Sequence, residues 1–173
     1  MLRAVSRGLD RVYLWAGYAA GALLVGMCAL VVYSILARRL GLYAGGATDV
    51  AGYVMATSTF LGLAYAFSTG GHIRVLLVVD RLGGAARRGL EIACLAVMSA
   101  VTLFLAWYMA CLALDSYVWG EVSEGADAIP LWIPQTPVAV GAALFALSVL
   151  HALLRALFDW ERVRPDAPGP GGG

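Results

Sequence analysis

Residues 92–114 read IACLAVMSAVTLFLAWYMACLAL, an uninterrupted run without Asp, Glu, Lys or Arg. A helix needs about 17 to 25 apolar residues to cross a hydrocarbon core roughly 30 Å thick, so this run is long enough to span a membrane. It lacks the alternation of apolar and polar residues that is typical of a membrane β-barrel strand. Because a backbone in lipid must satisfy its own N–H and C=O groups, the run predicts a transmembrane helix.

Three further runs lack charged residues and have a suitable length, at residues 12–36, 50–67 and 138–154. The 173-residue chain is 61% hydrophobic and 13% charged, whereas soluble domains have about 25% charged residues. The first run is too long for a signal-peptide core and ends in Arg38 and Arg39 rather than a cleavage site. We therefore predict an all-α membrane protein, a bundle of four transmembrane helices within residues 1–160. The Pro- and Gly-rich residues 161–173 are expected to form a disordered cytoplasmic tail.

The distribution of basic residues predicts the orientation of the four spans. All 12 are Arg, and ten of them fall on the side of the N-terminus if the runs cross the membrane in turn. Arg38 and Arg39 fall on the other side, where the last connection contains Glu121, Glu124 and Asp127. Positively charged residues are retained in cytoplasmic connections. We therefore expect a multi-pass plasma-membrane protein with both termini in the cytoplasm.

The connection between the second and third spans reads GGHIRVLLVVDRLGG over residues 70–84. Its apolar part is too short to cross a membrane. In a helix, Arg74 and Arg81 lie close to one another on the same face, because they are seven residues apart. We predict a short helix in the inner interface with its Arg side chains toward lipid phosphates. An irregular loop held near the membrane by its apolar residues is the alternative.

Small and hydroxyl-bearing residues occur inside the predicted spans. Gly17 and Gly21 form a GxxxG pattern in the first, and Thr57, Ser58 and Thr59 are consecutive in the second. Small residues allow helix backbones to approach closely, and hydroxyl groups can form hydrogen bonds between helices. Packing among the four helices and packing against another membrane protein both account for these residues, and the sequence leaves the two alternatives open.

Charged residues are missing from the middle of the predicted spans. Intramembrane charges usually mark a path for ions or substrates. The two histidines, His72 and His151, and three separated cysteines do not suggest a haem or metal site. We therefore expect no catalytic, cofactor-binding or metal-binding residues and a chain that is not an enzyme. An autonomous small transporter or channel is kept as the alternative function.

Several short motifs follow one another in a characteristic order. An acidic residue, Asp49, opens the second span, which contains FLGLAYA at residues 60–66. GHIRV follows at residues 71–75, and PLWIPQ at residues 130–135 precedes the fourth span. In this order, and over about residues 8–160, the chain resembles the small, DctQ-like membrane subunit of the tripartite ATP-independent periplasmic (TRAP) transporters.

The resemblance implies a place in a bacterial inner-membrane complex. Its partners are then a large membrane subunit, a periplasmic substrate-binding protein and inner-membrane lipids, with no nucleic acid. The large subunit holds the substrate and sodium sites in this family, so the small subunit is expected to need no cofactor and to scaffold the large one. The substrates of the family are mostly organic acids, including four-carbon dicarboxylates and sugar acids. The resemblance does not identify the substrate of this complex.

The matched motifs and the GxxxG pattern supply candidate contacts with the partner subunit or lipid: Asp49, His72, Arg74, Asp80, Arg81, Trp132, Pro134, Gln135, Gly17 and Gly21. Where the family commonly places an acidic residue after the GHIRV motif, this chain has Leu76, and we hypothesise that Asp80 takes its place. Pro130 and Pro134 are expected to stiffen the entry to the fourth helix. Trp132 is expected to anchor that entry at the outer interface, and Gln135 to cap backbone groups.

Overall fold

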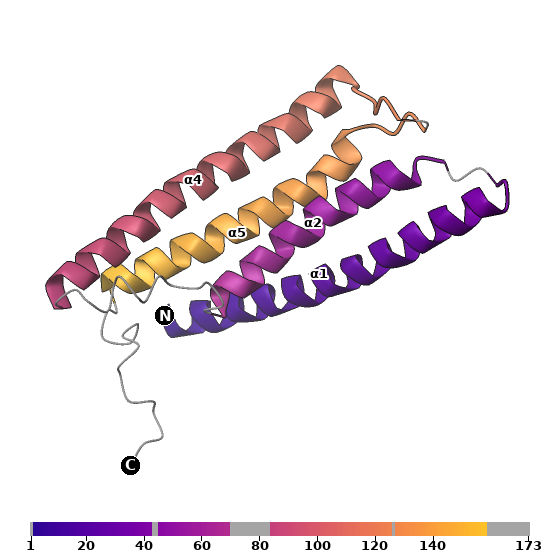
Figure 1. The fold of residues 1–173 in the computed structure, drawn as a ribbon. Coiled ribbons are helices and arrows are strands. Elements are labelled where there is room, and N and C mark those ends of the chain that lie inside the picture. The colour runs from indigo at the N-terminus through magenta and orange to yellow at the C-terminus, as the bar shows by residue number, and fades with distance from the viewer. Residues whose placement is uncertain (1, 43–44, 70–83, 126, 159–173) are drawn as a thin grey trace, which may run out of the picture.

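The computed structural model describes residues 2–42, 45–69, 84–125 and 127–158, without the side chains of residues 2–7, 84, 85 and 87. These residues form four helices (Figure 1): α1 (Leu2–Arg39), α2 (Ala47–Ser68), α4 (Gly84–Trp119) and α5 (Trp132–Phe158). Each helix is long and apolar enough to cross a membrane, which confirms the prediction of four helical spans. The predicted interfacial helix and the predicted tail lie outside the described residues.

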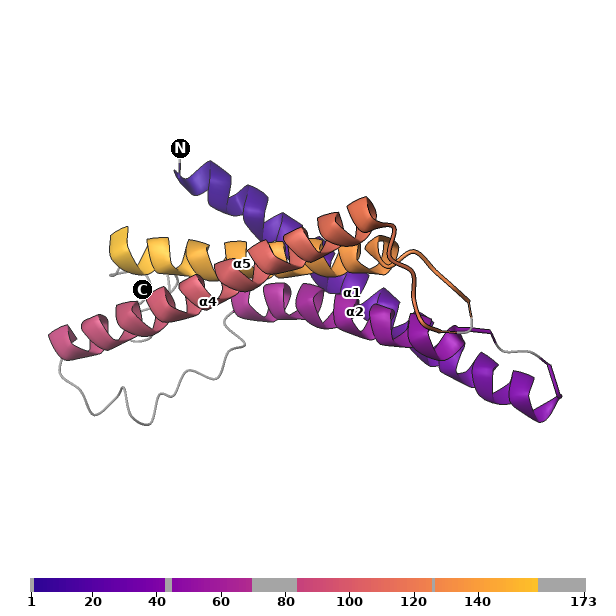
Figure 2. The ribbon, with the colours of Figure 1, turned by 90° about the horizontal axis from the view of Figure 1, so that it is seen from above.

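The helices extend well beyond the charge-free runs. α1 has 38 residues and α4 has 36. At 1.5 Å per residue they are about 57 Å and 54 Å long, whereas the hydrocarbon core is about 30 Å thick. Both helices must therefore tilt in the bilayer, project from it, or do both. Figure 2 shows α1 running obliquely to α5 rather than parallel to it.

α1 and α4 end in the same way, at a glycine in the left-handed conformation. Gly41 follows α1 with φ = 69°, and Gly120 follows α4 with φ = 65°. The N–H of Leu42 donates to the carbonyl of Ala37 at 2.9 Å, and that of Glu121 donates to Ser116 at 3.0 Å. These are the six-to-one hydrogen bonds of a Schellman motif, which glycine favours because it has no Cβ. The two glycines therefore set the helix ends on the side away from the N-terminus.

The helices are arranged as an open layer, which corrects the prediction of a bundle. Among the described residues, α1 packs against α2, α2 against α5, and α5 against α4, whereas α1 reaches α5 at only a few positions. The spatial order is therefore α1, α2, α5, α4 (Figure 1). α4 has no substantial contact with the described parts of α1 or α2. Lipid tails solvate apolar side chains as well as another helix does, so nothing forces the layer to close.

The buried hydrophobic cluster lies between α2 and α5. Ala64, Phe145 and Val149 form the buried cluster, and partly buried Phe60, Leu63, Phe67, Met98 and Leu144 surround it. The rings of Phe67 and Phe145 meet edge to face with centroids 6.2 Å apart. α5 also packs against α4 on its other side, so it lies between α2 and α4 in the layer. The connections between α1 and α2 and between α4 and α5 lie at the end opposite to the N-terminus (Figure 1).

Candidate partner-contact surface

Gly17, one of the candidate contact residues, packs inside the layer. A Cβ built on Gly17 would lie 2.7 Å from Cγ of Tyr65 on α2, well inside van der Waals contact. The Tyr65 ring is attached at this atom, so it cannot swing aside without a change of rotamer. Gly21 differs, because a Cβ there would meet nothing within 4 Å. Gly17 thus contributes to the packing of α1 against α2, whereas Gly21 is open to lipid or to a partner.

Gly141 makes a similar close approach that was not predicted from the sequence. A Cβ on Gly141 of α5 would lie 2.9 Å from Cβ of Phe60 and 3.4 Å from the backbone nitrogen of Leu61, both on α2. Backbone atoms and Cβ atoms move only with the whole helix, so this contact fixes the separation of α2 and α5. No second small residue stands four positions away to mark Gly141 in the sequence as part of a GxxxG pattern.

The hydroxyl groups of α2 form hydrogen bonds within their own helix. Thr57 Oγ1 donates to the carbonyl of Tyr53 at 3.0 Å, and Thr59 Oγ1 and Ser58 Oγ both donate to Met55, at 2.8 and 2.9 Å. Thr102 on α4 and Ser148 on α5 bond in the same way to carbonyls three or four residues earlier. This back-bonding satisfies the hydroxyls locally. The sequence leaves open whether hydroxyl groups form hydrogen bonds between helices, and these donors form theirs within their own helices.

The connection between α4 and α5 is tied to the start of α2. Gly46, which precedes α2, donates its N–H to Asp127 Oδ2 at 2.7 Å. The Asp49 carboxylate also lies against Gly125 of the same connection. A carboxylate at a helix N-terminus satisfies a free N–H and interacts favourably with the helix dipole. Asp127 therefore caps α2 from outside, a role that the sequence does not reveal because Asp127 and Gly46 are 81 residues apart.

The connection has an ordered shape of its own. Val122 and Pro130 form an isolated antiparallel bridge. The N–H of Ser123 donates to the Ile129 carbonyl at 2.8 Å, and that of Leu131 donates to Glu121 at 3.0 Å. Ser116 Oγ on α4 donates to the Glu121 carboxylate at 2.8 Å. The acidic side chains of this connection are thus held on a short hairpin-like loop over the ends of α2, α4 and α5.

The entry to α5 contains three of the candidate residues. Trp132 begins the helix and meets Tyr117 of α4 edge to face, with ring centroids 5.5 Å apart. Pro134 lies in the first turn, where a missing N–H is tolerated. The N–H of Gln135 donates to the Leu131 carbonyl at 3.2 Å. Its side-chain Oε1 is buried and has no hydrogen-bond partner among the described residues, so the predicted cap by this oxygen is not formed.

A second set of polar contacts joins the helices at the N-terminal end. Arg155 of α5 lies 3.8 Å from the Asp10 carboxylate of α1, and Arg88 of α4 donates to the carbonyl of Leu157 at 3.3 Å. Between α1 and α5, Tyr13 is buried with its ring 6.5 Å from that of His151. The charged groups of the described helices therefore gather at the two ends of the layer and leave the middle apolar.

The middle of the layer presents a broad apolar surface. On the edge helix α4, Phe104 and Trp107 are 63% and 69% exposed, and on the edge helix α1, Trp15 and Val25 are 72% and 71% exposed. Between α4 and α5 lies an apolar groove of about 440 Å³, lined mainly by alanines and bounded by Tyr117 and Trp132. A layer of this kind can contact lipid or another membrane protein over both of its faces.

The remaining candidates, His72, Arg74, Asp80 and Arg81, lie outside the described residues, as does Leu76. Asp49, Trp132, Pro134 and Gln135 gather at the end of the layer away from the N-terminus. Gly17 and Gly21 lie near the middle of α1.

The four-helix chain matches a known family of membrane proteins. A family model described as "Tripartite ATP-independent periplasmic transporters, DctQ component" matches residues 27–159, which is most of the chain. A comparison with curated proteins finds no match. The matched region includes the whole of α2, α4 and α5, and with them the loop that caps α2. The four apolar helices and the family match agree in indicating a multi-pass membrane protein that serves a transporter. The chain belongs to the DctQ component family of the tripartite ATP-independent periplasmic transporters.

Proposed function

We propose that this small TRAP subunit is a non-catalytic scaffold for the large membrane subunit of a sodium-coupled importer of organic acids. The observation that carries the proposal is the open apolar layer. Two central helices, α2 and α5, enclose the buried cluster, while the edge helices α1 and α4 leave large side chains exposed. Such a layer is suited to lie along a larger membrane protein and to widen its footprint in the bilayer.

The chemistry of the spans supports a scaffold rather than a carrier. Residues 12–36, 50–67, 92–114 and 138–154 contain no Asp, Glu, Lys or Arg. A carrier of organic anions needs cationic or strongly polar groups at its binding site, since a charge is costly in hydrocarbon. Substrate and sodium are therefore assigned to the large subunit, and a periplasmic binding protein delivers the substrate. This chain is proposed to need no cofactor of its own.

The proposed topology places both termini in the cytoplasm. The N-terminus of α1 and the C-terminal end of α5 lie at the same end of the layer (Figure 1). The excess of Arg at that end supports its assignment to the cytoplasmic side. The loop between α4 and α5, which caps α2, then faces the periplasm. The binding protein approaches from that side.

Co-purification tests the scaffold proposal. The tagged chain is expressed with its genomic neighbours, extracted in a mild detergent, and compared with an unrelated four-span protein that carries the same tag. We expect a stoichiometric complex with a large polytopic membrane protein, and only with this chain. Recovery of the chain alone, from cells shown to contain the neighbouring large membrane protein, would contradict the proposal.

A further inference from the structure

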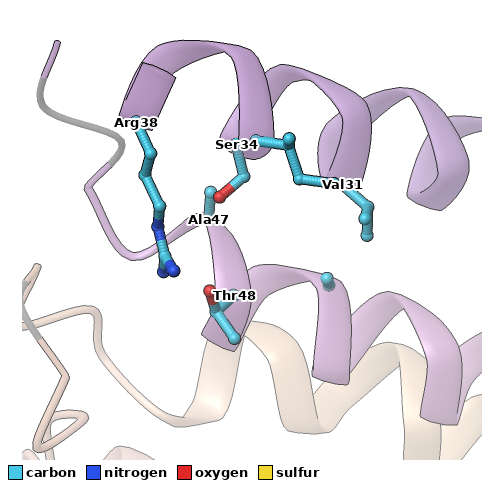
Figure 3. A pocket seen from close by; sticks show the side chains of 7 residues that line it. Val31, Ser34, Arg38, Ala47 and Thr48 are labelled. Atoms are coloured by element: carbon cyan, nitrogen blue, oxygen red, sulfur yellow. The ribbon is translucent and has the colours of Figure 1, made fainter. Parts of the chain in front are cut away.

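A small cleft lies between α1 and α2 at the end of the layer away from the N-terminus. Its volume is about 210 Å³, and it is lined by Val31, Ser34, Ile35, Arg38, Ala47, Thr48 and Ala51. Figure 3 shows Arg38 reaching from the last turn of α1 toward Thr48 in the first turn of α2. The cleft lies at one end of the interface between α1 and α2. Neither the family match nor the proposed function assigns it a role.

The polar groups of the cleft are available to a ligand. The side chains of Arg38, Ser34 and Thr48 have no hydrogen-bond or ion-pair partner among the residues that the structure describes. No carboxylate is among the described residues that line the cleft, so Arg38 is the one charged residue of that lining. The nearest carboxylate in sequence, Asp49, lies instead against Gly125 of the loop between α4 and α5. The cleft therefore combines an uncompensated cation with two hydroxyl groups.

Along α1 the cleft extends from Arg38 in the last turn, past Ser34 and Ile35, to Val31, which lies about two turns closer to the middle of the helix. Val31 and Ile35 precede Arg38 on α1, toward the middle of the span, and Ala51 lies one turn into α2 beyond Thr48. Arg38 and Thr48 lie near the helix termini. A charged residue just beyond the charge-free residues 12–36 is expected at the headgroup layer. This polarity matches an amphiphile with an anionic head and a hydrocarbon tail.

We propose that the cleft binds one phospholipid of the adjacent leaflet, with its phosphodiester at Arg38, Ser34 and Thr48. The planar guanidinium can donate two parallel hydrogen bonds to phosphate oxygens, and such charge-assisted bonds are stronger than neutral ones. One acyl chain lies along Val31 and Ile35 on α1 and Ala51 on α2. On the proposed topology the lipid belongs to the periplasmic leaflet. A soluble phosphate ester would leave the apolar wall unused, which favours the lipid.

Native mass spectrometry of the purified full chain with phosphatidylglycerol tests this site. We compare wild type with Arg38→Gln, Arg38→Lys, Ala51→Leu and the matched control Arg39→Gln. Arg39 has the same charge on the neighbouring position but does not line the cleft. We expect Arg38→Gln to weaken binding of the first lipid by about tenfold, as for the loss of charge-assisted hydrogen bonds. Arg38→Lys has a smaller effect, and Arg39→Gln stays within about twofold of wild type.

The Ala51→Leu variant and a second ligand test whether the site binds a lipid rather than a soluble phosphate ester. Ala51→Leu fills the apolar wall and keeps Arg38, so it should also weaken lipid binding, while circular dichroism confirms that the helices remain. sn-Glycerol 3-phosphate supplies the phosphate ester without acyl chains and should bind far more weakly than the lipid. Equal losses in Arg38→Gln and Arg39→Gln would show non-specific attraction and overturn the site. Equal affinity for glycerol phosphate, or unchanged lipid binding in a folded Ala51→Leu, would overturn the assignment to a lipid.

Discussion

Single glycines set the spacing of the helices in this protein. At Gly17 the Tyr65 ring of α2 occupies the space that a side chain would need, and at Gly141 the Phe60 Cβ does so. In a membrane, where apolar side chains gain little by leaving lipid for protein, close backbone approach and good packing supply most of the association energy. The loss of such a contact is therefore felt directly in the stability of the layer.

Gly17→Ala is expected to destabilise the protein, whereas Gly21→Ala is not. The added methyl at Gly17 collides with Cγ of Tyr65, and overpacking of this kind costs about 1 to 3 kcal/mol. At Gly21 the methyl has open space. Thermal unfolding in detergent should show a lower Tm for Gly17→Ala only. In a Tyr65→Ala background the penalty at Gly17 should vanish, and a penalty that persists there would refute the proposed collision.

The ion pair between Asp10 and Arg155 is expected to contribute little to stability. The two side chains are 53% and 46% exposed and their closest atoms are 3.8 Å apart. Exposed pairs of this kind usually contribute less than about 1 kcal/mol, because solvent screens them. A double-mutant cycle with Asp10→Asn and Arg155→Gln, measured at low and high salt, should give a coupling energy below that limit. A coupling energy that exceeds it and is insensitive to salt would show a more important contact.

Individual residues differ in how far their roles can be predicted from the sequence. Gly17 could be nominated from the GxxxG spacing because helical periodicity is local. Asp127 could not be identified as the cap of α2. Its role as acceptor depends on the tertiary path of its loop, which brings it to Gly46, 81 residues away in the chain. Arg38 contributes to the predicted orientation through its charge, but its position in a cleft depends on the turn that brings α2 beside α1.

At the scale of the elements, the helices were predictable and their lengths were not. The charge-free runs identified all four described helices because a continuous apolar stretch of about 20 residues matches the thickness of the hydrocarbon core. The ends were missed because a helix does not stop at the first charged residue after an apolar run and can continue into the headgroup layer. Glycines in Schellman motifs end α1 and α4 after Arg39 and Trp119, several residues beyond the charge-free runs.

The loop between α4 and α5 is expected to stabilise the first turn of α2 through Asp127. Replacing Asp127 with Ala leaves the Gly46 N–H without its acceptor, at a cost of about 1 kcal/mol for a lost cap. Amide exchange at residues 45–52, followed by mass spectrometry, should become roughly fivefold faster. Glu124→Ala is the matched control, because Glu124 belongs to the same loop and makes no hydrogen bond to the described residues. Equal exchange rates in the two variants would exclude the cap.

At the scale of the whole molecule, the order α1, α2, α5, α4 was not predictable from the sequence. The spans are apolar on all sides, so no stripe of polarity indicates which helix each one faces. The order is set by close contacts, such as those at Gly17 and Gly141, that become apparent only in three dimensions. The resemblance to the DctQ component, by contrast, could be found from short motifs, and the family match over residues 27–159 confirms it.

The orientation of the layer leads to a prediction for reporter fusions. On the proposed topology, which places both termini in the cytoplasm, a fluorescent protein fused after residue 173 should fluoresce, and alkaline phosphatase at that position should be inactive. Phosphatase inserted after Glu124, in the loop between α4 and α5, should be active, because the same topology places that loop in the periplasm. The opposite pattern at the two positions would invert the topology and move the proposed lipid site to the cytoplasmic leaflet.

Uptake by reconstituted liposomes tests the central claim most directly. Liposomes with an inward sodium gradient receive this chain alone, the large subunit alone, or both, together with the periplasmic binding protein and a panel of labelled dicarboxylates and sugar acids. The scaffold account predicts no uptake above empty liposomes for this chain alone, and sodium-dependent uptake when both subunits are present. Solute uptake by this chain alone would contradict the account and would show that the small subunit is itself a carrier.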